Sequence, residues 1–203
     1  MIQIFLKGGP VMWPLLITSV IAISVVLERL FFSVKESMRR DPEAVERIFS
    51  EVEAGEEDRA LAFSRESQDY VARVLAYALE HRELSPTSAL LRAASRELNR
   101  FNRGLSILDT VITLAPLLGL LGTVTGMIRS FSLLGGQELG APTAITGGIA
   151  EALIATAFGL LIAIIALIPF NFLNTKMEDA RHEIEDAASR MDALLKQEPA
   201  LAK

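Results

Sequence analysis

Glu151 is the residue in this sequence with the clearest potential for chemistry, because it is an acidic side chain inside a long apolar stretch. The 12 residues before it, 139–150, and the 24 residues after it, 152–175, carry no charge. About 20 apolar residues are enough for a helix to cross a bilayer. On insertion scales, an ionised side chain at mid-membrane costs roughly 2.5–3.5 kcal/mol. Such a residue therefore indicates a function, for example in moving protons. The alternative, a glutamate at the membrane edge that reaches the headgroups, is disfavoured by the uncharged residues that precede it.

Small residues follow one face of the same predicted helix. They recur at spacings of three and four, and two glycines one turn apart lie in the preceding apolar run. Small residues let membrane helices approach closely. On an ideal helix Glu151 lies about 40° from Gly148 and from Ala155. The sequence therefore predicts a carboxylate beside a helix-packing seam formed by Gly122, Gly126, Gly148, Ala152, Ala155 and Gly159.

Two threonines are candidates for the same pathway. Thr123 precedes the end of the second apolar run by six residues, and Glu151 follows the start of the third by seven. At about 1.5 Å per residue, both should lie roughly 9–10 Å below one membrane surface. Thr156 follows Glu151 by five residues and so lies about 140° around the helix, which favours an oligomer over a monomer. The alternative role for these hydroxyls is a hydrogen bond to their own helix one turn earlier.

Composition excludes several classes of protein. Hydrophobic residues make up 51% of the 203 residues and charged residues 22%, which is too apolar for an ordinary soluble domain. The sequence has no cysteine and only two histidines, so we expect no metal site, no cofactor and no ordinary enzymatic activity. Basic residues are interleaved with acidic ones and aromatic residues are few, which argues against nucleic acid as a partner.

Three apolar helices must position these residues. We expect residues 1–34 to hold an N-terminal segment and a first transmembrane helix that is too long for a signal peptide. Residues 105–175 should form the second and third spans with a short Gly-rich connection. The predicted fold class is an all-α integral membrane protein with three transmembrane helices.

The remaining residues belong to two charged segments. In 35–104, Asp41-Pro42 and Ser85-Pro86 each predict a helix start and Gly55 predicts a hinge, with a last helix that enters the second span without a break. In 176–203, a heptad stripe continues the third helix into water, through Met177, Ala180, Ile184, Ala187, Met191 and Leu194. Residues 29–103 hold 13 of the 20 Lys and Arg, and the tail after the third span holds 5. The charge distribution therefore predicts that both segments are cytoplasmic and that the N-terminus is outside.

Three blocks of sequence resemble the MotA/TolQ/ExbB family of proton-channel subunits, and more closely its ExbB/TolQ branch. They are Gly8-Gly9-Pro10 with Glu28-Arg29, the run APLLGLLGTVTGM at 115–127, and the run GIAEALIATA at 148–157. Subunits of the MotA type have a fourth span and lack this glutamate, so that branch fits less well.

The resemblance implies a pentamer in the bacterial inner membrane that surrounds a dimer of a single-span ExbD/TolR-like partner, with a TonB/TolA-like protein as a further partner. Such a complex couples proton motive force to work across the periplasm. Glu151, Thr123 and Thr156 match the family's polar pore-lining positions. Thr125 stands where many relatives have an aromatic residue, so the local width of the pore stays open.

Two other functions remain open from the sequence. A non-conducting scaffold would use the seam and the stripe only to assemble a ring around a single-span partner. A small-solute transporter would usually show inverted repeats, and none is visible. The driven process also stays open between outer-membrane transport, envelope maintenance and a gliding-type motor stator, as does the choice between H⁺ and Na⁺.

Overall fold

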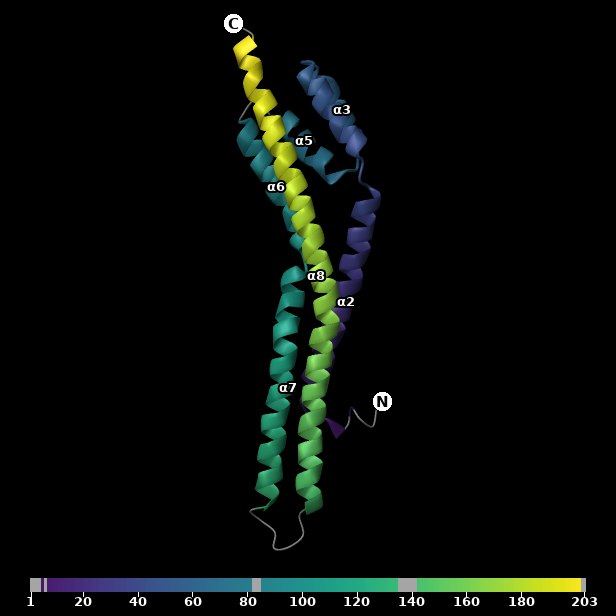
Figure 1. Ribbon diagram of the computed structural model, residues 1–203, viewed down its shortest axis with the longest axis vertical. Helices are drawn as coiled ribbons and strands as arrows, with labels where there is room; N and C mark the ends of the chain where they lie inside the picture. The colour runs from purple at the N-terminus through teal and green to yellow at the C-terminus, as the bar shows by residue number, and fades with distance from the viewer. Residues whose placement is uncertain (1–4, 6, 82–84, 135–141, 202–203) are drawn as a thin grey trace. The chain divides into compact units, whose positions relative to one another are not determined.

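The computed structural model describes residue 5 and residues 7–81, 85–134 and 142–201, and in these residues it contains helices and no strand (Figure 1). The labels follow Figure 1. In chain order the helices are α2 (Met12–Met38), α3 (Pro42–Glu53), α4 (Glu57–Glu66), α5 (Tyr70–Glu80), α6 (Pro86–Asn102), α7 (Leu105–Leu134) and α8 (Pro142–Leu201).

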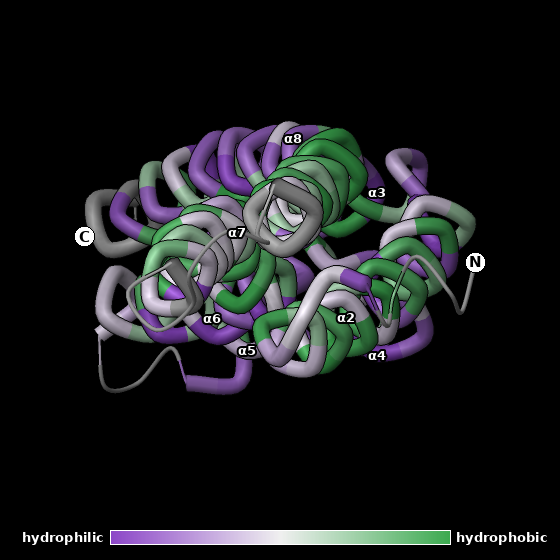
Figure 2. Tube along the Cα trace, turned by 90° about the horizontal axis from the view of Figure 1, so that it is seen from below, coloured by the Kyte–Doolittle hydropathy of each residue, from purple (hydrophilic) through white to green (hydrophobic). Residues whose placement is uncertain are grey.

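Three helical stretches are long and apolar enough to cross a membrane. They lie within Met12–Met38, Pro86–Ser132 and Thr146–Lys196. Figure 2 shows hydrophobic residues along α2 and the first part of α8, and hydrophilic residues toward the C-terminal end of α8. The prediction of an all-helical chain with three apolar spans is confirmed for the described residues.

The chain divides into two compact units. The apolar unit consists of Met1–Arg29 and Gly104–Phe172, and the charged unit of Leu30–Arg103 and Leu173–Lys203. The sequence pattern suggested two separate charged segments, at 35–104 and 176–203. In the structure these segments belong to one unit.

The apolar unit is a packed group of three helices. Ala22 of α2, Val111 of α7 and Ala166 of α8 form one buried cluster. Nearer the N-terminal end of α2, Met12 and Leu15 pack against Ala115 of α7. Each of the three helices contributes an alanine to these clusters, which lets the helices approach closely.

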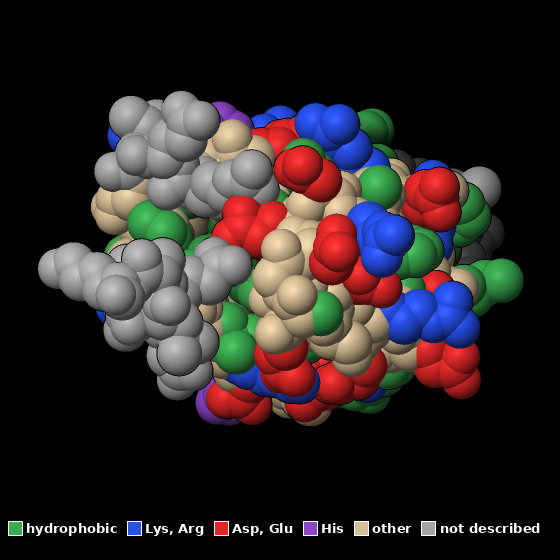
Figure 3. Space-filling view, turned by 90° about the horizontal axis from the view of Figure 1, so that it is seen from above, with side chains coloured by type: hydrophobic (Ala, Val, Ile, Leu, Met, Phe, Trp, Pro, Cys, Tyr) green, Lys and Arg blue, Asp and Glu red, His purple; other side chains and the backbone are tan. Residues whose placement is uncertain are grey.

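The charged unit has a hydrophobic core of its own. Buried residues of α3, α5 and α6 surround the C-terminal part of α8, where Ala180, Ile184, Ala187 and Met191 are buried. The stripe that looked like a heptad seam therefore packs against helices of its own chain. At the surface acidic and basic side chains are interspersed (Figure 3), and Arg190 of α8 pairs with Glu46 and Glu53 of α3.

Local signals set the helix boundaries in this unit. The Asp41 side chain accepts a hydrogen bond from the Ala44 N–H and the Ser85 side chain accepts one from the Ser88 N–H, each with proline at the start of the helix. Both predicted N-caps are confirmed. Gly55, the predicted hinge, follows α3 with φ of +76°, a left-handed conformation that favours glycine, and the chain turns there.

One prediction about this region is wrong. The helix before the second span was expected to enter it without a break, but α6 ends at Asn102 and α7 begins at Leu105. Gly104 has φ of +83° and Arg103 an extended ψ of 128°. A left-handed glycine after the last turn ends a helix, because it redirects the backbone out of the helical ladder.

Candidate functional site

The α7–α8 contact is built from glycine and alanine on both helices. A Cβ added to Gly122 would lie 2.5 Å from the Cβ of Ala155, and one added to Gly126 would lie 3.1 Å from the Cβ of Ala152. The residue number rises along α7 while that of its neighbour on α8 falls, so the two helices are antiparallel. At the other end of the contact, a Cβ on Gly159 would lie 2.5 Å from the carbonyl oxygen of Ala115. The two backbones are therefore too close for larger side chains at these positions.

Ser130 lies at the end of this contact where α7 ends and α8 begins. Its side chain is buried, and its hydroxyl donates to the carbonyl oxygen of Gly126 at 2.9 Å. A Cβ on Gly148 would lie 1.8 Å from the Ser130 Oγ, so Ser130 occupies the space that this glycine leaves free. Arg129 precedes Ser130, and successive residues of a helix are 100° apart, so Arg129 lies to one side of the seam. It is next to the turn of α8 that follows Gly148.

Glu151 lies on that turn and pairs with Arg129. Arg129 Nη1 donates to Glu151 Oε1 at 3.0 Å, and 22% of the Glu151 side chain is exposed against 53% for Arg129. The acidic group is therefore partly enclosed in the apolar unit, with a cation from α7 on its open side.

The N-terminal turn closes the other side of Glu151. Gly9 has φ of +74°, and a Cβ added there would lie 1.9 Å from Glu151 Oε1, the same oxygen that accepts from Arg129. Gly8 beside it is buried, and a Cβ there would lie 3.1 Å from the Ile154 Cγ2. The Gly8-Gly9 pair thus brings bare backbone against the carboxylate, which a larger residue could not do.

The structure places the two threonines of the predicted pathway differently. Thr123 donates to the carbonyl oxygen of Leu120 in its own helix at 2.6 Å. Thr156 donates across the helix pair to the carbonyl oxygen of Gly119 at 3.0 Å. Thr125 is exposed and also donates within α7, to Leu121 at 2.9 Å. No hydrogen bond brings Glu151, Thr123 and Thr156 together among the described residues.

The register of α7 against α8 places Thr123 and Glu151 at different depths, although the sequence predicted equal depths. Ala155 lies opposite Gly122 and Ala152 opposite Gly126, so Thr123 is level with the turn around Ala155. Glu151 is level with Gly126 to Ser130. The two residues expected at equal depth are therefore about three residues, or roughly 4–5 Å, apart along the helix axis.

Comparison with known proteins decides the family of this chain. The model of the MotA/TolQ/ExbB proton channel family matches residues 66–186. Synechocystis sp. has a protein named ExbB-like 1 that is 41% identical over 182 residues, which cover 83% of this chain and 68% of that protein. The chain belongs to the MotA/TolQ/ExbB proton channel family. The predicted resemblance is confirmed.

Further relatives lie in the ExbB and TolQ branch of this family. The ExbB-like 3 protein of Synechocystis sp. is 36% identical over 80% of each chain. The Tol-Pal system protein TolQ of Haemophilus influenzae is 38% identical over 89 residues, 44% of this chain and 35% of that protein. The MotA/TolQ/ExbB family is one of transport and energy transduction, and the three apolar helices of this member make it a multi-pass membrane protein.

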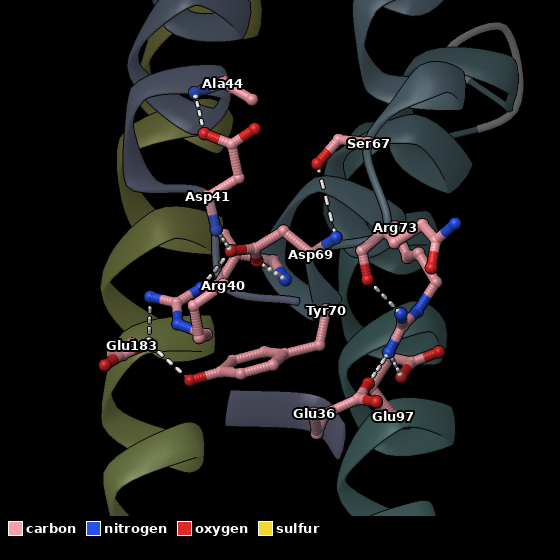
Figure 4. A network of polar contacts seen from close by, with 12 residues as sticks. Glu36, Arg40, Asp41, Ala44, Ser67, Asp69, Tyr70, Arg73, Glu97 and Glu183 are labelled. Atoms are coloured by element: carbon pink, nitrogen blue, oxygen red, sulfur yellow. Dashed lines mark hydrogen bonds and ion pairs between the residues drawn. The ribbon is translucent and has the colours of Figure 1, made fainter. Parts of the chain in front are cut away.

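This family member has a second polar cluster, in its charged unit (Figure 4). The Asp69 carboxylate is fully buried and accepts from the Arg40 guanidinium, from the Asp41 N–H at 2.8 Å and from the Val71 N–H at 2.7 Å. Tyr70 donates to Glu183 of α8. Burial and this hydrogen bond raise the pKa of Tyr70 above its ordinary value of 10. The contacts join α5 to α8 and to the chain before α3, and so hold the helices of this unit together.

Arg73 forms the second half of the cluster. It donates to Glu97 at 2.9 Å and to the buried carboxylate of Glu36. Burial lowers the pKa of Arg73, but the hydrogen bonds to Glu97 and Glu36 outweigh it and raise the pKa. Both carboxylates are therefore paired with a permanent cation. No three His, Cys, Asp or Glu side chains of the described residues converge as metal ligands.

Sequence reasoning missed Arg129 and Gly9 as parts of the site. Arg129 is the one cation between the second and third apolar runs, and Gly9 lies in a block quoted for its family resemblance. Each therefore carried a signal. What the sequence could not show is that two segments distant along the chain lie against the Glu151 side chain.

Proposed function

We propose that this chain is the proton-channel subunit of a complex that couples proton motive force to work across the periplasm. The observation that carries the proposal is Glu151, an ionisable side chain in an apolar three-helix unit, held next to Arg129. The family match supports the same role, since its model describes proton channels. Glu151 is proposed as the group that takes up and releases the proton, with Thr123 and Thr156 as further hydroxyls of the pathway.

The surface of the apolar unit supports the proposal of a complex of several subunits. Many large apolar side chains of α7 and α8 are exposed in the single chain, for example Leu117, Leu121, Val124, Leu153, Leu161 and Ile164. The seam of small residues is already used between α7 and α8 of one chain. We therefore propose that these outer faces contact lipid, other copies of the chain in a pentamer, and a dimer of a single-span ExbD/TolR-like partner. A TonB/TolA-like protein is proposed as a further partner.

The energy available fits a mechanical role. One charge that crosses 100 mV supplies about 2.3 kcal/mol. A few protons passing Glu151 could thus drive a conformational step of several kcal/mol in the partner. We propose the bacterial inner membrane as the location, with the N-terminus periplasmic and the charged unit cytoplasmic, because Lys and Arg concentrate in that unit.

The test is proton uptake into proteoliposomes that contain the chain with its co-purified partner. Glu151→Gln should abolish uptake while the complex still assembles, and Thr123→Val should reduce it. Thr110→Val is the matched control, because Thr110 also bonds to its own helix, at Ser106, and is exposed. Normal uptake by an assembled Glu151→Gln complex would reject the channel role and leave a scaffold around a path lined by another protein.

A further inference from the structure

The contacts of Glu151 indicate that its access to protons is controlled, which the proposed channel role does not itself require. Arg129 Nη1 donates to Glu151 Oε1 at 3.0 Å. Gly9 lies beside the same side chain, where an added Cβ would come within 1.9 Å of Oε1 and 2.7 Å of the carboxyl carbon. Arg129 comes from α7 and Gly9 from the N-terminal turn. Two segments of the same chain thus converge on the group that would carry the proton.

We propose that Arg129 is a latch that holds Glu151 closed to proton exchange in the resting subunit. In this state the Arg129 guanidinium is bonded to the Glu151 carboxylate, and Gly9 lies beside the same side chain. Glu151 exchanges its proton faster when the Arg129 side chain moves away. Arg129 is therefore a positioning residue that acts through Glu151, and the proposal rests on the proposed function only in assigning Glu151 to the proton path.

The surroundings favour a side chain that can open and close. Arg129 is 53% exposed, so its long side chain has room to leave the carboxylate. The backbone beneath it is fixed, because the neighbouring Ser130 is buried opposite Gly148. Opening can then proceed by rotation of one side chain, while the two helices keep their register.

The Arg129–Glu151 ion pair is also weak enough to break and re-form. Partly exposed ion pairs contribute little, typically up to about fivefold in an equilibrium. Such a contact keeps the group occupied for most of the time and still breaks without a large barrier. A fully buried pair would hold the carboxylate permanently, because breaking it leaves an uncompensated charge.

The test uses a hydrophobic carbodiimide, which reacts with protonated carboxyl groups inside membranes, on the purified full-length chain in liposomes without a partner. The rate of modification of Glu151 is followed by mass spectrometry of the peptide that contains it. Arg129→Gln should raise this rate by about three- to fivefold, the range that a partly exposed ion pair supplies. Arg129→Lys should stay within about twofold of wild type because it restores the cation. Arg129→Met keeps the apolar part of the side chain and serves as a second neutral variant if Arg129→Gln fails to fold.

Lys7→Gln is the matched control, since it removes an exposed positive charge from the N-terminal segment of the same unit. It should leave the rate within about twofold of wild type. A rate in folded Arg129→Gln and Arg129→Met equal to wild type would overturn the latch, and so would an equal rise in Lys7→Gln. These outcomes are independent of the proposed function, which stands or falls on proton uptake by the Glu151→Gln complex.

Discussion

Thr156 of α8 donates its hydroxyl hydrogen to the carbonyl oxygen of Gly119 of α7 across 3.0 Å. A Cβ on Gly119 would lie 3.0 Å from the Cα of Thr156, so the hydrogen bond forms where the two backbones lie close together. The residue expected to line a proton path therefore also ties the two helices together. A mutation at this position will affect stability as well as any transport.

Thr156→Val should lower the stability of the helix pair by about 0.6–1 kcal/mol, because an interhelical hydrogen bond in a membrane protein contributes that much. Thr156→Ser keeps the hydroxyl and should change stability less. The measurement is unfolding of the purified chain in mixed micelles with increasing SDS. Thr110→Val removes a hydroxyl bonded within its own helix and is the control. Equal losses for Thr156→Val and Thr110→Val would contradict the assignment.

Gly9→Ala should displace the Glu151 carboxylate and reduce proton uptake by the complex. The new Cβ would lie 1.9 Å from Glu151 Oε1, and the φ of +74° adds about 1–2 kcal/mol of strain for any residue with a Cβ. Gly147→Ala is the control, because a Cβ there meets nothing within 4 Å. Uptake is measured in proteoliposomes with the partner present. The contact is unimportant if Gly9→Ala matches Gly147→Ala at equal levels of assembled complex.

Asp69→Ala should destabilise the charged unit by about 3 kcal/mol, because it removes a fully buried carboxylate that accepts from a guanidinium and two backbone N–H groups. Lys196→Ala breaks the exposed pair with Asp192 and should change stability by less than about 1 kcal/mol. Chemical denaturation of the full chain, followed by circular dichroism, compares the two variants. A loss below about 1 kcal/mol for Asp69→Ala would refute the structural role of this carboxylate.

Tyr70 should ionise above the ordinary tyrosine range. Its pKa is raised from 10 in the folded chain, so the neutral phenol is favoured by folding. The resulting stabilisation is fully present below pH 10 and is lost as the pH rises through the folded pKa. Absorbance titration should show one tyrosine that ionises late, and Tyr70→Phe should remove it. A late component that persists in Tyr70→Phe would assign the effect to Tyr77 instead.

Local sequence signals were sufficient for much of this fold. The apolar spans follow from length and composition, and the starts of α3 and α6 follow from an Asp-Pro and a Ser-Pro pair. The break at Gly104 was missed because the helical periodicity continues on both sides of it. A single glycine inside a periodic pattern does not reveal from sequence whether it adopts a left-handed conformation.

Contacts between segments distant along the chain were harder to predict from the sequence. The stripe from Met177 to Leu194 has the spacing of a coiled-coil seam, but its part from Ala180 to Leu194 packs on α3, α5 and α6, which offer their own apolar faces. The position of Glu151 beside a seam followed from helical spacing alone. Its pairing with Arg129 depends on the register of α7 against α8, and that register is set by several glycines acting together.

The glycine and alanine contact between α7 and α8 has a consequence for how force is produced. Backbone lies against backbone along this contact, as at Gly119 and Thr156 or Gly159 and Ala115. Such an interface contains almost no rotatable side chains, so it has no alternative packing to switch into. The α7–α8 pair should therefore move as one rigid body, and a conformational change of this subunit should occur outside the contact between these two helices.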